Sequence, residues 1–202
     1  MDEIIWATPL YEFIKQCNDT ALEKTVLDCG AGSDPDRAPP LFLFYQHGYK
    51  TYGIEIAEDA LVSANKFCKK NNLPLDIFRG DMRRIPFANE TFSFVYSFNA
   101  ISFMTKPDIE LAMREIERVL KPGGLCYVNF ISVDDPDQRP FRKTAFARRL
   151  LRSKRFSHHK DNEADKYFSN FEILRKEKRL IEKLYDGERI KQAYIGYIAR
   201  KA

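Results

Sequence analysis

The feature that most constrains the fold is a regular alternation between short apolar runs and amphipathic helical patterns. Runs typical of β-strands occupy Thr25–Leu27, Thr51–Ile56, Leu75–Phe78, Phe92–Ser97 and Leu125–Ile131. Helical patterns occupy Leu41–His47, Ala57–Asn71 and Asp108–Leu120, after an amphipathic opening stretch around Pro9–Asn18. Because a helix between two strands joins them as a parallel pair, this alternation predicts an α/β fold with a mainly parallel sheet and helices on both faces.

The C-terminal part departs from this alternation. Two strand-like runs, Lys178–Leu184 and Arg189–Ala199, are joined by Tyr185-Asp186-Gly187-Glu188. Asp-Gly between two such runs is typical of a tight β-hairpin. We therefore expect an antiparallel hairpin at the end of the parallel sheet. Earlier in the chain, Lys121-Pro122-Gly123-Gly124 is expected to stop a helix and turn the chain into the next strand.

The length of the chain and its pattern of apolar residues limit the class of protein to which it can belong. With 202 residues, the chain is long enough to bury a core as one domain without metals or disulfides. It contains no run of roughly 18 apolar residues, and Met1–Trp6 lacks the basic and then apolar pattern of a secretion signal. We expect a single cytoplasmic domain with no membrane partner.

Cysteine and histidine usage argues against two classes of enzyme. The four cysteines include no Cys-x-x-Cys pair, and the three histidines are scattered. Neither a metal site nor a Ser-His-Asp triad is therefore expected. The thiols are expected to be free, as in a reducing compartment.

A glycine-rich turn follows the first predicted strand. Gly30 and Gly32 lie in Thr25-Val-Leu-Asp-Cys-Gly-Ala-Gly-Ser-Asp-Pro35, directly after the strand. In a parallel α/β sheet, ligands bind at the carboxyl ends of the strands, beside the turn after the first strand. Two glycines there let the backbone approach a ligand closely, although two glycines alone would equally suit an ordinary strand-to-helix turn.

Polar residues also end three further predicted strands. Glu55 ends the second strand, where an acidic side chain can accept both hydroxyl hydrogens of a ribose. Asp81 follows the third and can accept from an adenine amino group, while Met82 offers a soft apolar surface to the ring. Ser97-Phe98-Asn99 ends the fourth. Together these strand ends favour a nucleoside-containing cofactor over isolated turn residues.

With these residues the chain resembles the class I S-adenosylmethionine-dependent methyltransferases, specifically the type 11, UbiE-like group. Val26–Gly32 is similar to the first motif of that family, and Gly80-Asp81-Met82 with Ile85-Pro86-Phe87 is similar to its adenine segment. Glu115–Gly124 closely resembles its E-x-x-R-V-L-K-P-G-G signature. The resemblance implies a single Rossmann-like domain with a seven-stranded sheet and S-adenosyl-L-methionine as cofactor, released as S-adenosyl-L-homocysteine.

The resemblance also implies a cofactor site. Asp28 would orient the loop and approach the methionine amino group, Glu55 would bind the ribose, and Asp81 with Met82 would bind the adenine. The segment from Ser97 to Asn99 would line the methionyl moiety. The full set of expected cofactor-binding residues is Asp28, Gly30, Ala31, Gly32, Glu55, Ile56, Asp81, Met82, Ser97, Phe98, Asn99 and Phe103.

One position departs from the family pattern. Where the family has a third small residue, this chain has Asp34, followed by Pro35. Ser33 or Asp34 is suited to cap the next helix with Pro35 in its first turn, and the alternative is a carboxylate facing the cofactor's positive charge. Pro35 also disfavours a dinucleotide site of the form G-x-G-x-x-G, which needs glycine or alanine there.

The acceptor side of the site is less defined. Methyl transfer from a sulfonium mainly requires alignment, so no catalytic residue is predicted. Candidate bases, chosen only because their segments are expected to border the site, are Tyr11, His158, His159 and Tyr167. Residues 1–20 are expected to form a helical cap, and the insertion 134–170 a substrate lid.

The insertion contains a basic stretch. Residues 141–160 include eight Lys or Arg and no Asp or Glu, although the net charge of the whole chain is only +4. This pattern is typical of a solvated helix face with Phe146, Leu150 and Leu151 packed inward. The alternative is recognition of an anionic acceptor or of nucleic-acid phosphate. The basic residues are Arg142, Lys143, Arg148, Arg149, Arg152, Lys154, Arg155 and Lys160.

Three functions follow from this reading. The first is methyl transfer to a small-molecule acceptor. The second is methylation of nucleic acid, with RNA bound by the basic stretch. The third is a module that binds S-adenosylmethionine without catalysis, because a fold does not by itself imply an activity.

Overall fold

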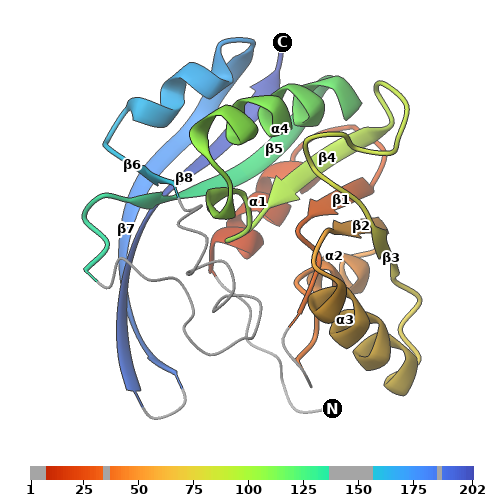
Figure 1. Cartoon of the computed structure of the whole chain (residues 1–202). Helices are drawn as coiled ribbons and strands as arrows, with labels where there is room; N and C mark the ends of the chain where they lie inside the picture. Colours follow the sequence, from red (N-terminus) through yellow and green to blue (C-terminus); the bar gives the residue numbers. More distant parts are fainter. Residues whose placement is uncertain (1–7, 34–36, 137–156, 186–187) are drawn as a thin grey trace.

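The computed structural model describes residues 8–33, 37–136, 157–185 and 188–202 (Figure 1). These residues form one sheet with strand order β3-β2-β1-β4-β5-β8-β7, and β6 pairs with β5 outside this path. The strands are β1 (Thr25–Cys29), β2 (Lys50–Glu55), β3 (Asp76–Arg79), β4 (Phe92–Ser97), β5 (Leu120–Ser132), β6 (His158–His159), β7 (Phe171–Tyr185) and β8 (Glu188–Lys201). Strands β1 to β6 pair in parallel, whereas β8 is antiparallel to β5 and β7. The predicted fold class is confirmed, and β6 is a short strand that the sequence did not reveal.

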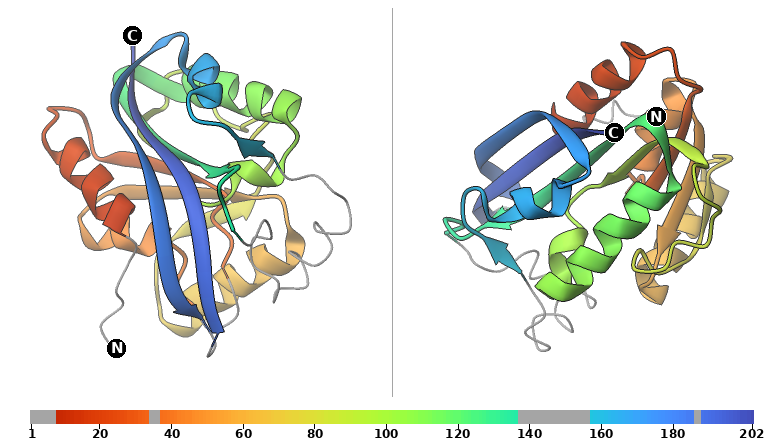
Figure 2. Two further views of the ribbon diagram at one scale, coloured as in Figure 1. Left: turned by 90° about the vertical axis from the view of Figure 1, so that its left-hand side faces the viewer. Right: turned by 90° about the horizontal axis from the view of Figure 1, so that it is seen from above.

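Helices cover both faces of this sheet. They are α1 (Thr8–Asn18), α2 (Leu41–Gln46), α3 (Glu58–Lys70) and α4 (Lys106–Val119), with 3-10 turns η1 (Ile101–Phe103) and η2 (Glu163–Phe168). Apolar side chains of α1, α2 and α3 pack into one core, and those of α4, η1 and η2 pack into a second core on the opposite face. Figure 2, seen from above, shows α1 and α4 on opposite sides of the sheet. Among the described residues, no helix combines the length and the apolar character that crossing a bilayer requires.

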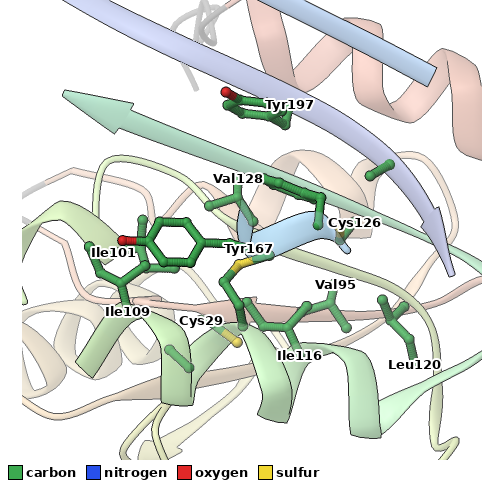
Figure 3. Close-up of a cluster of buried hydrophobic side chains, with 14 of the residues drawn as sticks. Cys29, Val95, Ile101, Ile109, Ile116, Leu120, Cys126, Val128, Tyr167 and Tyr197 are labelled. Carbon is green, nitrogen blue, oxygen red and sulfur yellow. The ribbon is translucent and has the colours of Figure 1, made fainter. Parts of the chain in front are cut away.

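Helix α4 illustrates how the sequence produces the second core. Thr105 caps its first turn by accepting a hydrogen bond from the Asp108 N–H at 3.3 Å, and Pro107 suits that turn because the first helical N–H groups have no partner within the helix. Ile109 and Ile116 recur at helical spacing and face the sheet, where they share one core with Val128 of β5 (Figure 3). Burying each such side chain stabilises the fold by about 1.5–3 kcal/mol.

The junction between α4 and β5 differs from the expectation. The predicted turn Lys121–Gly124 lies inside β5, which begins at Leu120 directly after the helix. Phe92 pairs with Leu120 and Phe94 with Leu125, so the extra residues on β5 form a bulge opposite β4. The proline and glycines therefore break the pairing register locally while the strand continues.

The terminal hairpin is confirmed and is longer than predicted. β7 begins at Phe171, before the expected start at Lys178, and β8 lies between β5 and β7. This part of β7 contains the consecutive charged residues Arg175–Arg179, whose side chains form ion pairs, as Arg175 does with Glu177, so it lacks the apolar alternation that reveals a strand. The Asp186-Gly187 turn lies outside the described residues.

Candidate functional site

The loop after β1 folds back over the end of β2. The N–H groups of Gly30 and Ala31 both donate to the Ile54 carbonyl, at 2.9 and 3.0 Å. Gly30 has φ +113°, and a Cβ there would lie 2.3 Å from the Cβ of Ala100. Glycine is thus required by the backbone conformation and by the packing of this loop against the segment after β4. Ala31, in the same loop, is fully buried.

Glu55 is fixed at the end of β2 by two backbone donors. Its Oε2 accepts from the Gly32 N–H at 3.0 Å, and its Oε1 accepts from the Ala57 N–H at 2.8 Å. Burial raises the pKa of Glu55, and these hydrogen bonds oppose that rise. Each carboxylate oxygen keeps a second lone pair, so Glu55 can still accept two hydroxyl hydrogens. A Cβ on Gly32 would lie 2.7 Å from Oε2, which explains the glycine there.

Asp28 is a buried carboxyl group on β1, 1% exposed. The Tyr96 hydroxyl donates to its Oδ2 at 2.7 Å from the neighbouring strand β4. Burial raises the pKa of Asp28 to about 8, with the charge of Glu55 adding to the rise and the Tyr96 bond opposing it. Asp28 is therefore mostly protonated at neutral pH, and a cation placed beside it would favour its ionised form.

The carboxylate of Asp81 is already engaged by a neighbouring side chain. Arg83 donates from Nε to Oδ1 at 3.0 Å and from Nη2 to Oδ2 at 2.7 Å, and it reaches Asp108 at the start of α4. The hydrogen bond from Arg83 lowers the pKa of Asp81. A contact from Asp81 to an adenine amino group, as the sequence predicts, would therefore share this carboxylate with a guanidinium. Met82 packs against the second core, and its methyl lies 3.9 Å from where a Cβ on Gly30 would be.

The end of β4 holds a further group of predicted residues. Ser97 is fully buried, and its Oγ has no hydrogen-bond partner in the described part of the chain. Asn99 has φ +56° and forms two hydrogen bonds with Asn129 of β5: its N–H donates to Oδ1 at 2.7 Å, and its Oδ1 accepts from Nδ2 at 2.6 Å. Phe98 packs against Tyr127. Asn129 is not among the residues predicted from the sequence. The only hint of its role there is an amide side chain inside an otherwise apolar strand.

The predicted residues therefore gather at one edge of the sheet, where β1, β2, β3 and β4 end. The Gly80 N–H donates to the Glu55 carbonyl at 3.1 Å, which ties the Asp81 segment to the end of β2. Ile56, an apolar residue directly after Glu55, is 49% exposed. Acceptors suited to ribose hydroxyls, a buried acid suited to an ammonium group and an apolar surface suited to an adenine thus occur together, so these residues fit an adenosyl sulfonium. Phe103, in η1, is partly buried.

A clamp from α4 holds the segment after β3. Arg118 donates to the carbonyls of Phe87 and Ile85 at 2.8 and 2.9 Å, and Glu115 accepts from the Ile85 N–H at 2.8 Å. The two side chains also pair with each other, with Nε to Oε1 at 2.7 Å. The E-x-x-R part of the signature therefore fixes the segment that contains Asp81, a role that the sequence did not disclose.

The family model "Methyltransferase domain" (Methyltransf_11) matches residues 27–128, which is half of the chain. The chain belongs to this methyltransferase family. The predicted resemblance is confirmed, and S-adenosylmethionine is accordingly the cofactor of the domain. The match spans the sheet edge described above, from the end of β1 to the middle of β5.

Curated relatives of the methyltransferase domain align over part of their length. A sterol 24-C-methyltransferase of Saccharomyces cerevisiae is 32% identical over 127 residues, which are 60% of this chain and 32% of that protein. A demethylmenaquinone methyltransferase of Streptomyces griseus is 41% identical over 76 residues, which are 37% of this chain and 30% of that protein. The chain thus spans about a third of the length of these relatives.

Solved structures share the fold at low identity. A structure described as a SAM-dependent methyltransferase from Methanosarcina mazei superposes with a TM-score of 0.67 at 17% identity, covering 98% of this chain and 99% of that chain. This likeness agrees with the Rossmann-like fold predicted from the sequence.

The four candidate bases of the methyltransferase domain occupy different environments. His159 is fully buried against Phe130, and burial lowers its pKa to about 4. Tyr167 belongs to the same core. Tyr11 contacts His47 at the end of α2, where the chain turns into the amino end of β2. His158 is partly buried, and its Nε2, like Nδ1 of the buried His159, has no hydrogen-bond partner in the described ranges.

Several predictions concern residues outside the described ranges. Asp34 and Pro35 are among them, as are Phe146, Leu150, Leu151 and all of the basic residues between 141 and 160 except Lys160. Ser33 is described, and the expectation that it caps the next helix is wrong, because α2 begins only at Leu41, with Pro40 at its N-cap. Lys160 is exposed, and its N–H donates to Glu163 at 3.0 Å. Binding of nucleic acid by this stretch stays a prediction. The described residues contain no group of three or more His, Cys, Asp or Glu side chains that could hold a metal ion.

Proposed function

We propose that the protein is an S-adenosylmethionine-dependent methyltransferase that acts on a small-molecule acceptor. The observation that carries the proposal is Glu55, held by the Gly32 and Ala57 N–H groups so that its remaining lone pairs are free at the carboxyl edge of the sheet. The buried acid Asp28 on the adjacent strand supports it.

Each side chain then has a specific role. Glu55 accepts the ribose hydroxyls, Asp28 faces the methionine ammonium group, and Ile56 with Met82 covers the adenine. Ser97 offers its unpartnered hydroxyl to the methionyl end. Gly30, Ala31 and Gly32 supply the loop backbone, Asp81 lies at the adenine rim, and Phe98, Asn99 and Phe103 line the methionyl side.

The chemistry divides between cofactor and protein. When bound, S-adenosylmethionine supplies a methyl group already activated by the sulfonium charge. The protein's task is to hold the acceptor in line with that methyl and to exclude water, so no strongly nucleophilic side chain is needed.

The acceptor class is supported by the relatives. Two relatives carry names that specify sterols and demethylmenaquinone, which are small molecules. We further propose that the chain is one domain, with residues 1–20 as a cap and 134–170 as a substrate lid. The four buried free cysteines support a reducing compartment such as the cytoplasm.

Calorimetric titration with S-adenosylhomocysteine tests the cofactor site. The wild type should bind at one site, and Glu55→Ala should weaken binding by about 100-fold or more, because hydrogen bonds to a charged group contribute roughly 1.5–3 kcal/mol each. Glu58→Ala is the matched control: Glu58 is exposed on α3 and pairs only loosely with Arg79, at 3.8 Å, so binding should not change. Binding of a nicotinamide dinucleotide in place of S-adenosylhomocysteine would refute the proposal.

A further inference from the structure

Four polar side chains lie on one face of the sheet at the carboxyl end of β5. Ile131 pairs with His158 of β6 on one side and with Tyr194 of β8 on the other. Residues paired across strands share a face, as do residues two apart along a strand. Asn129 and Gln192 therefore lie on the same face as Ile131. We call Asn129, His158, Gln192 and Tyr194 the β5 polar cluster.

Two atoms of this cluster lack hydrogen-bond partners. Gln192 is only 4% exposed, and its Oε1 has no partner in the part of the chain that the structure describes. The same holds for Nε2 of His158. Because folded proteins satisfy nearly all buried polar groups, two such atoms on one face indicate a place where a ligand can bind.

The cluster adjoins the cofactor edge through Asn129. This residue bonds to Asn99, at the end of β4, by two hydrogen bonds of 2.7 and 2.6 Å. Asn99 lies in the segment proposed to line the methionyl group. A ligand on the β5 polar cluster would therefore lie beside the reacting end of the cofactor.

The surroundings define the chemical class of this ligand. Ile131 supplies apolar surface between the polar groups. The charged side chains nearby are engaged already: Asp135 accepts from the Ala193 N–H at 2.8 Å, and Arg179, paired with Tyr194 in the hairpin register, forms ion pairs with Glu12 and Glu177. Burial lowers the pKa of His158, which keeps its imidazole neutral at pH 7. These features favour a neutral ligand with an apolar frame.

We infer that the β5 polar cluster binds the methyl acceptor, a neutral compound with an apolar frame and at least two hydroxyl groups, through Gln192 Oε1 and His158 Nε2. Gln192 accepts a hydrogen from one hydroxyl, and His158 bonds to the other. The inference rests on the proposed function, because it assigns the acceptor side of the same site.

Ligand binding to the protein saturated with S-adenosylhomocysteine tests this inference, with resorcinol (1,3-dihydroxybenzene) as probe. Wild type should bind resorcinol, and Gln192→Leu and His158→Phe should each weaken binding about tenfold by removing a hydrogen bond. The matched controls, Gln46→Leu and His47→Phe at the exposed end of α2, should bind like wild type. The probe 1,3-dimethoxybenzene, which has no hydroxyl hydrogens, should bind at least tenfold more weakly than resorcinol.

A measurement on the unaltered protein covers the case in which a variant does not fold. Resorcinol should shift the imidazole ¹⁵N signals of His158 and leave those of His47 in place. Resorcinol that fails to bind wild type, or that binds both cluster variants as tightly as wild type, overturns the inference. If S-adenosylhomocysteine itself does not bind, the proposed function fails instead, and the calorimetric titration separates the two outcomes.

Discussion

Asp28 is the residue whose chemistry depends most on its surroundings. It is a carboxyl group almost without solvent contact, bonded to the Tyr96 hydroxyl, with a pKa raised to about 8 by burial. A protonated acid is neutral until a positive charge arrives beside it. If Asp28 faces the methionine ammonium group, as we propose, cofactor binding is coupled to loss of its proton.

This coupling predicts that cofactor affinity depends on pH. Below pH 8 the proton of Asp28 must leave before its carboxylate can face the methionine ammonium, so the affinity for S-adenosylhomocysteine should rise as the pH increases from about 5.5 to 7.5, by up to about tenfold per pH unit. Titration calorimetry in buffers with different ionisation enthalpies measures the released proton.

Asp28→Asn provides the comparison, since an amide of the same shape cannot ionise. Its affinity should be lower at pH 7.5 and should lose the part of the pH dependence that Asp28 contributes. A wild-type affinity that is constant from pH 5.5 to 7.5 would contradict the coupling.

Single residues at the site could be predicted when the signal was local. Glu55 and the glycines follow from their position at strand ends. Asp81 and Arg83 are only two residues apart, but Arg83 also pairs with Asp108 of another element. The pairing of Asn99 with Asn129 depends on the register of β4 and β5. Such partners are 25 and 30 residues apart, so only the folded structure reveals them.

At the scale of elements, α4 does more than cover the sheet. Arg118 and Glu115 tie it to the segment after β3 by bonds to Phe87 and Ile85. One turn of the helix thus provides hydrogen-bond partners for two backbone carbonyls and one N–H of a segment that has no regular secondary structure. The position of the Asp81 segment is thus linked to the packing of α4.

Removing this clamp should weaken both stability and cofactor binding. We expect Arg118→Met to lower the free energy of unfolding by about 1–3 kcal/mol, because it leaves the Phe87 and Ile85 carbonyls without their donor and the Glu115 carboxylate without its ion-pair partner. Affinity for S-adenosylhomocysteine should also fall, since the segment with Asp81 loses its support. Urea unfolding and calorimetry measure the two effects.

The same helix supplies the control. Arg114 is exposed and pairs only with Glu110, at 3.9 Å, so Arg114→Met should change stability by less than about 0.5 kcal/mol. Equal effects of the two substitutions would show that loss of charge on α4, and not the clamp, is responsible.

Elements were predictable to different degrees for physical reasons. Helix α4 has a cap and an apolar face at helical spacing, so its sequence determines it locally. The start of β7 has charged residues that hide its strand character: Glu172 pairs with Arg200 across the hairpin, and Arg175 pairs with Glu12 of α1. β6 has only two residues and exists because β5 offers it an edge.

At the scale of the whole molecule, two cores on opposite faces share the strands of one sheet. Cys29 and Val95 contribute to one core, and Val26 and Phe94 on the same two strands contribute to the other. The shared strands stay ordered only while both cores are intact. Loss of one core therefore also disrupts the other. The described residues should therefore unfold as one unit.

This arrangement predicts a single unfolding transition. Ile116→Ala, in the α4 core, and Phe44→Ala, in the α2 core, should each shift the whole transition, by about 2–5 and 3–5 kcal/mol respectively, without separating it into two. Circular dichroism and tyrosine fluorescence should give coincident curves. Leu111→Ala, at a half-exposed position of α4, should have a much smaller effect. Two resolved transitions would refute one cooperative domain.

The place of β8 in the sheet has a consequence for biosynthesis. Residues 125–131 of β5 pair with residues 194–200, so the ribosome must translate a further 60 or so residues before the second edge of β5 can be covered. During that interval a nascent chain presents an apolar strand with open N–H and C=O groups, which is a template for association with other chains. Slowed translation between these segments should therefore increase aggregation, whereas the finished sheet keeps that edge covered.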